Sequence, residues 1–237
     1  MSSAAPLISV RNVGVRYRVN RNPFRKRYYD ALKNISFDLY PGDSLGIVGR
    51  NGAGKTTMLR LLSGIIAPDS GYIDFADITT SLLSLQVGFD PELSGRDNAI
   101  LSGMLLGFPM KTIESNLDTI FAFSELTDFI DKPVKFYSAG MRARLGFSIT
   151  LGLSPDVLLI DEVLGVGDID FRKKSMEVMK EKLLSDQTIV LVSHSAATVK
   201  ELCNRAVWIK NGVSKMEGDA VTVVNAYEQD LLRHAKK

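Results

Sequence analysis

A glycine-rich loop between an apolar strand and an amphipathic helix constrains this sequence more than any other feature. The loop reads GRNGAGKT from Gly49 to Thr56 and fits G-x-x-x-x-G-K-[ST] without a mismatch. Residues 45–48 before it have the composition of a short buried strand. After it, apolar residues recur on one face of a helix at Met58, Leu61, Leu62 and Ile65. Glycines let backbone N–H groups face phosphate oxygens, and the helix start adds partial positive charge. The segment therefore predicts a phosphate-binding site.

Within this loop, two side chains are expected to touch the ligand most directly. Lys55 is expected to reach the β- and γ-phosphates of a nucleotide, and Thr56 to place its hydroxyl on Mg²⁺. The full set expected to line the nucleotide is Gly49, Arg50, Asn51, Gly52, Ala53, Gly54, Lys55, Thr56 and Thr57.

Polar residues follow two further strands at the end where ligands bind in open α/β sheets. The apolar run 157–160 ends in Asp161 and Glu162. We expect Asp161 to act on the Mg²⁺ side, mostly through water, and Glu162 to be the base that polarises an attacking water. His194 follows the strand at 188–193 and is expected to contact a γ-phosphate or hold that water.

The order of strands and helices predicts the fold class. Strand-like runs occur at 7–17, 32–40, 45–48, 157–160, 188–192 and 206–209. Helical spacing dominates near 91–152 and recurs at 171–184, 196–202 and 221–232. Alternation of strand and helix predicts an α/β domain with a parallel sheet, into which a helical lobe is inserted. Asn211-Gly212 has the composition of a hairpin turn.

Composition narrows the class of protein. The chain has 29 Lys and Arg against 27 Asp and Glu, a balance that argues against a dedicated nucleic-acid binder. It contains neither a secretory leader nor the roughly 18 consecutive apolar residues of a membrane-spanning helix, so we expect a cytosolic chain. Cys203, the single cysteine, is expected to be a small apolar residue, and His234 a surface residue. A basic insertion at 18–27 holds Arg21, Arg25, Lys26 and Arg27.

With these residues, the chain resembles the ATP-binding subunit of ABC transporters along nearly its whole length. The stretch Tyr137-Ser138-Ala139-Gly140-Met141 stands where that family has its signature motif, and Asp168 stands in its D-loop. The resemblance implies an ABC-type P-loop fold: a mixed RecA-like core sheet, an antiparallel β subdomain and a helical subdomain at about 91–152, in one ATPase domain over 1–237. It also implies ATP and Mg²⁺ as ligands, and two copies of the chain that sandwich ATP head to tail. Ser138, Ala139, Gly140 and Met141 would then act on the nucleotide of the second copy, with Ser138 capping the helix 139–152.

Two assignments stay open. The aromatic residue expected to stack on adenine is Tyr17. Tyr28 and Tyr29 are alternatives, because the basic insertion could fold back toward the nucleotide. The family's Q-loop glutamine, which senses Mg²⁺ and the membrane partner, is assigned to Gln86. A strand over 81–87 competes with this assignment, and Asp90 could occupy that position instead. The signature itself departs from the common pattern at Ala139 and Met141.

Those departures, together with GFDPELSGRDN and DEVLGVGDIDFRKK, resemble the ATPases of bacterial polysaccharide exporters. The resemblance implies ATP-driven export of a lipid-linked polysaccharide (O-antigen, capsule or teichoic acid type) across the inner membrane. It implies two copies of an integral-membrane permease as partner, a location on the cytoplasmic face of that membrane, and no nucleic-acid partner. The basic insertion would lie near the membrane surface, and no C-terminal carbohydrate-binding domain is expected.

Other functions remain possible at this point. The chain could be the ATPase of another ABC exporter, or a soluble ABC ATPase of translation or DNA repair. The single phosphate loop and the lack of sustained heptads argue against the soluble classes. A P-loop kinase is a third alternative, against which the signature and D-loop residues argue.

Overall fold

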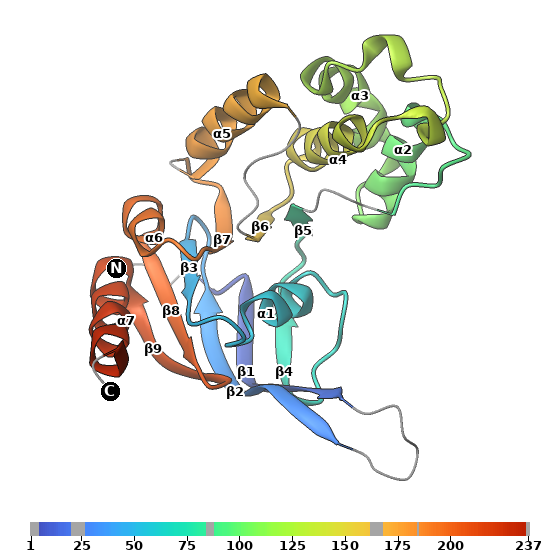
Figure 1. The fold of residues 1–237 in the computed structure, drawn as a ribbon. Coiled ribbons are helices and arrows are strands. Elements are labelled where there is room, and N and C mark those ends of the chain that lie inside the picture. The colour runs from blue at the N-terminus through green and yellow to red at the C-terminus, as the bar shows by residue number, and fades with distance from the viewer. Residues whose placement is uncertain (1–4, 20–26, 84–87, 162–167, 184, 236–237) are drawn as a thin grey trace. The chain divides into compact units, whose positions relative to one another are not determined.

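The computed structural model describes residues 5–19, 27–83, 88–161, 168–183 and 185–235 (Figure 1). The chain forms two compact units. The first comprises Met1–Ile78 and Leu183–Lys237, and the second comprises Thr79–Lys182. Each unit is described by itself below. None of the helices in the described ranges is long and apolar enough to cross a membrane.

The first unit is built on a mixed sheet with the strand order β4-β1-β2-β9-β8-β3-β7. Its strands are β1 (Ile8–Arg18), β2 (Tyr28–Leu39), β3 (Ser44–Val48), β4 (Ser70–Phe75), β7 (Thr188–Val192), β8 (Arg205–Lys210) and β9 (Val213–Asp219). β3 runs parallel to both β7 and β8, whereas β1 pairs antiparallel with β2 and with β4. The predicted parallel core and antiparallel β subdomain are both present.

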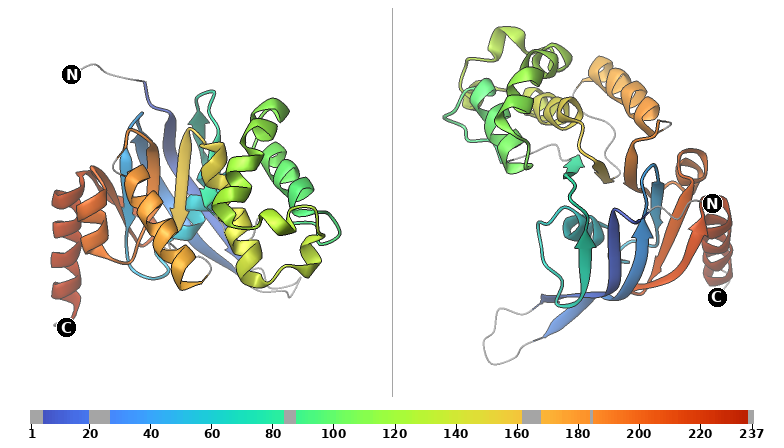
Figure 2. Two further views of the ribbon diagram at one scale, coloured as in Figure 1. Left: turned by 90° about the horizontal axis from the view of Figure 1, so that it is seen from above. Right: turned by 180° about the vertical axis from the view of Figure 1, so that it is seen from behind.

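The fully buried strands β3 and β7 lie side by side in the first unit, and every residue of each is buried. Continuous apolar runs of this kind are typical of strands that are covered on both faces. Helices α6 (Ala196–Leu202) and α7 (Ala220–Ala235) contact each other, and both contact β3 (Figure 2). A residue just ahead of α7 caps this helix: the Asp219 carboxylate accepts a hydrogen bond from the Thr222 amide at 2.9 Å.

Helix α1 (Lys55–Leu62) is shorter than the periodicity predicted. Its buried face holds Met58, Leu61 and Leu62 as expected, but Ile65 lies beyond the helix and is 62% exposed. The helix ends because Gly64 adopts a left-handed conformation with φ 71° and donates its amide to the Leu61 carbonyl. The prediction for Ile65 was therefore wrong, and the glycine that ends the helix explains why.

The turn between β8 and β9 has the geometry that its sequence predicted. Asn211 and Gly212 have φ values of 54° and 78°, and the two strands pair antiparallel on either side of them. The Gly212 carbonyl also accepts the amide of Lys33 at 2.7 Å. This turn is thereby tied to β2.

The second unit consists mainly of helices that pack around their own core. Its elements are β5 (Thr80–Leu83), α2 (Gly95–Leu105), α3 (Met110–Ser124), α4 (Ala139–Leu153), β6 (Val157–Asp161) and α5 (Ile169–Leu183), with short 3-10 turns at Thr127–Phe129 and Val134–Phe136. Strands β5 and β6 pair in parallel. The core gathers fully buried side chains from α2, α3 and α4, among them Ala99, Ile113, Ile120 and Leu145. Helices α2 and α3 fall within 91–152, and α4 ends one residue beyond that range, at Leu153.

Candidate functional site

The phosphate loop has a backbone shape that only glycine adopts easily at two of its positions. Gly52 and Gly54 have φ values of 77° and 103°, in the left-handed region. A Cβ at Gly54 would also lie 2.7 Å from the Ala31 carbonyl oxygen and collide with Leu32. At the start of the loop, a Cβ on Gly49 would collide with the Ile209 carbonyl oxygen. The glycine pattern is thus required by backbone conformation and by contacts with β2 and β8.

Lys55 closes the loop on itself. It is the first residue of α1, and its Nζ donates to the carbonyl oxygens of Gly49 at 2.8 Å and Arg50 at 3.2 Å. The side chain is only 6% exposed, which is rare for a lysine. These bonds hold the ammonium group of Lys55, at the end of the loop, against the first two loop residues. Phosphate oxygens are expected at this place.

The start of α1 is open to an anion. Gly54 occupies the N-cap, and no side chain within the described ranges caps the first turn. The first amides of a helix therefore meet the loop with the positive end of the helix dipole behind them. Thr56, on this first turn, is exposed. These residues fit the phosphates of a nucleotide.

His194 lies at the same edge of the sheet as the phosphate loop. β3 and β7 are parallel neighbours in which Ile47 pairs with Val192, so the residues after Val48 and after Val192 leave the sheet at the same end. His194 is exposed and precedes the Ser195 cap of α6. Its predicted position beside the phosphates is compatible with this register.

Two of the three tyrosines proposed for adenine face the phosphate loop. Tyr17 and Tyr29 are paired across β1 and β2, so they share one face of that ladder. The Tyr17 hydroxyl lies 3.5 Å from Thr57 Oγ1, and the Tyr29 hydroxyl donates to the Gly52 carbonyl at 3.0 Å. Tyr28 lines a different cleft, together with Arg16 and Asp69, as strand alternation requires.

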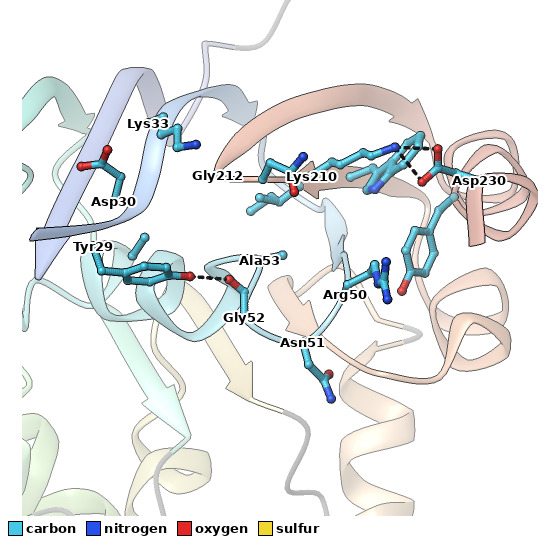
Figure 3. Close-up of a pocket in the computed structure, with 15 residues that line it drawn as sticks. Tyr29, Asp30, Lys33, Arg50, Asn51, Gly52, Ala53, Lys210, Gly212 and Asp230 are labelled. Carbon is cyan, nitrogen blue, oxygen red and sulfur yellow. Dashed lines mark hydrogen bonds and ion pairs between the residues drawn. The ribbon is translucent and has the colours of Figure 1, made fainter. Parts of the chain in front are cut away.

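A cleft of about 670 Å³ lies beside the loop, between β2, the β8–β9 turn and α7 (Figure 3). Tyr29 and the loop residues Arg50 to Ala53 form one side of this cleft. On the other side, Lys210 Nζ pairs with both carboxylate oxygens of Asp230 at 2.6 and 2.8 Å. A base that stacked on Tyr29 would border this cleft, whereas one that stacked on Tyr17 would lie beside Thr57.

The signature residues begin α4 in the second unit. Ser138 is the N-cap, and its hydroxyl accepts the Met141 amide at 3.1 Å, as the sequence predicted. Ser138 and Ala139 are exposed. Together they form a solvent-facing helix start, which offers backbone donors and a favourable dipole to an anion.

Within the described ranges, no contact and no backbone strain requires glycine at Gly140 in this helix start. A Cβ there would meet only Ser138 Oγ, at an ordinary distance of 3.8 Å, and its φ is not left-handed. Glycine in a helix is less stable than alanine by about 1 kcal/mol. Gly152 in the same helix is different, because its Cβ would lie 2.6 Å from Ile120 Cγ1.

Only some of the residues predicted for catalysis and for Mg²⁺ binding lie within the described ranges. Asp161 is half-buried at the carboxyl end of β6. Glu162 and Gln86 both lie outside the described residues, and their roles stay predictions. Asp90 is exposed, and its carboxylate accepts the Glu92 amide at 2.9 Å within a turn.

Sequence reasoning missed a buried asparagine that organises the segment after Gly88. Asn98 is fully buried on α2, and its amide donates to the carbonyls of Asp90, Leu93 and Ser94. Its own carbonyl accepts the Asp90 amide at 2.8 Å. A buried polar side chain with every partner present fixes a loop strongly. Hydrophobic periodicity does not reveal such a residue. The one signal in the sequence is a polar residue at a helix position where an apolar residue is expected.

Cys203 has no reactive character. The residue is buried at the end of α6, and burial raises the pKa of its thiol to about 12. Because the thiolate is the reactive form, Cys203 serves as a packing residue, in line with the prediction.

Comparison with known proteins gives the family. Residues 32–165 match the model described as ABC transporter. The chain is 42% identical over 205 residues to the O-antigen export system ATP-binding protein RfbB of Klebsiella pneumoniae, a match that covers 86% of this chain and 83% of that protein. It is 38% identical over 242 residues to the teichoic acids export ATP-binding protein TagH of Staphylococcus haemolyticus, which covers 97% of this chain and 91% of that protein.

Solved structures agree on the fold. A structure described as the ATP-binding subunit of an ABC transporter superposes with a TM-score of 0.76 at 20% identity, and covers 98% of this chain and 100% of that chain. A dimeric ATP-binding cassette, MJ0796, bound to ADP and Pi, superposes with a TM-score of 0.69 at 21% identity, and covers 90% of this chain and 98% of that chain. At these identities the likeness establishes the architecture alone.

Proposed function

Because this chain belongs to the family of ABC transporter ATP-binding proteins, we propose that it hydrolyses ATP to power the export of a lipid-linked polysaccharide through a separate membrane permease. The observation that carries the proposal is the combination of an intact, glycine-shaped phosphate loop with 38–42% identity, over most of the chain, to O-antigen and teichoic acid export ATPases. The chain would work at the cytoplasmic face of the inner membrane, held there by its permease.

Within this function, we assign ATP to the phosphate loop of the first unit. The amides at the start of α1 would bind the β-phosphate, and Lys55 would stabilise the β- and γ-phosphate charge. His194, at the same sheet edge, would contact the γ-phosphate or orient the attacking water. Glu162 remains the residue predicted to polarise that water.

The proposed Mg²⁺ ion fits the residue types of the loop. The Thr56 hydroxyl is exposed on the first turn of α1 and can serve as a ligand. Mg²⁺ would neutralise charge on the phosphate oxygens. Protein-bound Mg²⁺ keeps several waters and takes few side chains, so it does not need a dense acidic cluster. The described residues contain no such cluster. The assignments of Asp161 and Gln86 to this ion rest on the sequence.

We further propose that two copies act together. The signature start of α4 is an exposed helix start that could bind an anion, and no contact within the described ranges requires glycine at Gly140. Close approach of a ligand from outside the chain would supply a reason. The phosphates on a second copy are the ligand that the family resemblance implies, and the dimeric state of MJ0796 supports this assignment.

For the adenine base, we propose that Tyr17 is the stacking residue. Its hydroxyl lies beside Thr57 on α1, whereas Tyr29 is already engaged by the Gly52 carbonyl. Stacking of a base on an aromatic side chain contributes about 1–3 kcal/mol. Tyr17→Ala should therefore raise the KM for ATP about tenfold, and Tyr28→Ala, on the opposite face, should leave it unchanged. A larger effect from Tyr29→Ala in steady-state ATPase assays would transfer the role to Tyr29.

Export itself is tested in the organism that makes this chain. Deletion of its gene should remove one polysaccharide from the cell surface, while the lipid-linked precursor accumulates inside. Wild-type protein supplied from a plasmid should restore the surface polysaccharide, and Lys55→Met should not. Immunodetection of surface polysaccharide and extraction of the lipid-linked precursor provide the two readouts. An unchanged cell surface after deletion, or restoration by Lys55→Met, would rule out ATP-powered export by this chain.

A further inference from the structure

An arginine on the signature helix joins two acidic residues that come from different helices of the second unit. Arg144, on α4, lies with its Nη1 3.4 Å from Glu125 Oε2 and 3.5 Å from Asp168 Oδ2. Its guanidinium also lies over the Phe171 ring, at 5.6 Å from the centroid. The side chain is 16% exposed, so most of its stem is covered.

Both acids are held in place by other bonds, which makes the arginine's position well defined. Glu125 ends α3 in a left-handed conformation, and its second oxygen binds Lys174 Nζ at 2.9 Å. Asp168 accepts the Phe171 amide at 3.0 Å with its other oxygen and so begins α5. This backbone hydrogen bond, with a smaller contribution from Arg144, lowers the pKa of Asp168. The carboxylate is therefore ionised when it faces the guanidinium.

These contacts connect the two functional segments of the second unit. Ser138, the signature cap, begins the same helix that carries Arg144. Asp168, the residue assigned to the D-loop, directly precedes α5. Arg144 thus links the signature helix to Asp168.

Stability alone gives a weak reason for this arrangement. The two carboxylates are 52% and 63% exposed, and ion pairs at exposed positions stabilise a fold little. A fixed geometry gives a stronger reason, because small misplacements of catalytic groups reduce reaction rates strongly.

We propose that Arg144 is a positioning residue for ATP hydrolysis, which holds Asp168 against the signature helix so that the signature start and Asp168 keep one fixed geometry during turnover. The proposal rests on the function proposed above, since it concerns the turnover of ATP by the assembled transporter. Arg144 itself touches no reacting atom.

The test compares Arg144→Met with Lys174→Met in the complex with the permease. Both substitutions keep an apolar stem and remove one cation from Glu125, but only the first removes the partner of Asp168. Arg144→Met should lower kcat at least about tenfold with KM for ATP within about twofold of wild type. Lys174→Met should change neither constant beyond about twofold.

Two further variants separate positioning from folding. Arg144→Lys keeps the positive charge but replaces the planar guanidinium, whose Nη1 lies near both acids, with a single ammonium group, so it should restore part of the lost kcat. Arg144→Met combined with Asp168→Asn should be no slower than Asp168→Asn alone. Equal kcat losses in Arg144→Met and Lys174→Met, a rise in KM alone, or a kcat loss that tracks a fall in Tm would overturn the proposal. An active, exporting wild type with an unaffected Arg144→Met would refute only the positioning role, whereas absent export would refute the proposed function.

Discussion

Glu162→Gln should bind ATP normally and lose steady-state hydrolysis by roughly 10²- to 10⁴-fold, the range that a general base contributes. Glutamine has nearly the shape of glutamate but cannot accept the proton of the attacking water. Because binding remains while turnover stops, two copies with ATP should stay associated. Size-exclusion chromatography with Mg-ATP should show this dimer, and phosphate release should measure the lost turnover.

Lys55→Met is the matched control for this experiment. It removes the ammonium that spans Gly49 and Arg50, so nucleotide binding itself should be weakened and no ATP-dependent dimer should form. The two variants thus fail at different steps. Wild-type hydrolysis by Glu162→Gln would assign the base to another residue.

Gly140→Ala should lower ATP turnover about tenfold or more without loss of stability. The added methyl group has room inside the chain, and alanine stabilises a helix by up to about 1 kcal/mol over glycine. At the helix start, the methyl group would stand between the backbone donors and the anion that we propose they bind. Loss of a single such donor lowers rates by about 10²- to 10³-fold in other enzymes.

Gly152→Ala in the same helix should have the opposite effect on stability. Its Cβ would press against Ile120, so this variant should lower the free energy of unfolding. Chemical denaturation and ATPase assays on both proteins separate the two effects. If Gly140→Ala hydrolyses ATP at the wild-type rate, the signature start does not act on a nucleotide.

The sequence predicted the fold best where local pattern and tertiary structure agree. Buried strands β3, β6 and β7 and the Asn211-Gly212 turn follow from apolar runs and turn chemistry alone. The helical periodicity after the phosphate loop failed at Ile65, because a single left-handed glycine outweighed the spacing. Strand β4 was not predicted, since its residues are largely exposed and its pairing with β1 is non-local.

For the site, residues with a fixed motif were predictable and residues defined by contacts were not. Lys55 and Ser138 follow from the phosphate loop and from helix capping. Placing Tyr17 and Tyr29 on one face and Tyr28 on the other needed the β1–β2 register, which no local pattern encodes. Asn98 and Arg144 are defined by the partners that their side chains contact, which only the three-dimensional structure shows.

The self-closed phosphate loop has a kinetic consequence. Lys55 bonds to Gly49 and Arg50, and Gly52 and Gly54 hold left-handed conformations, through contacts that the chain itself supplies. Ordering one backbone residue costs about 1–2 kcal/mol, and a loop that is ordered in advance spares the ligand that entropy. Nucleotide capture by a single chain is therefore expected to be a one-step, second-order process, so that slow phases in the transport cycle report association of two chains rather than entry of ATP.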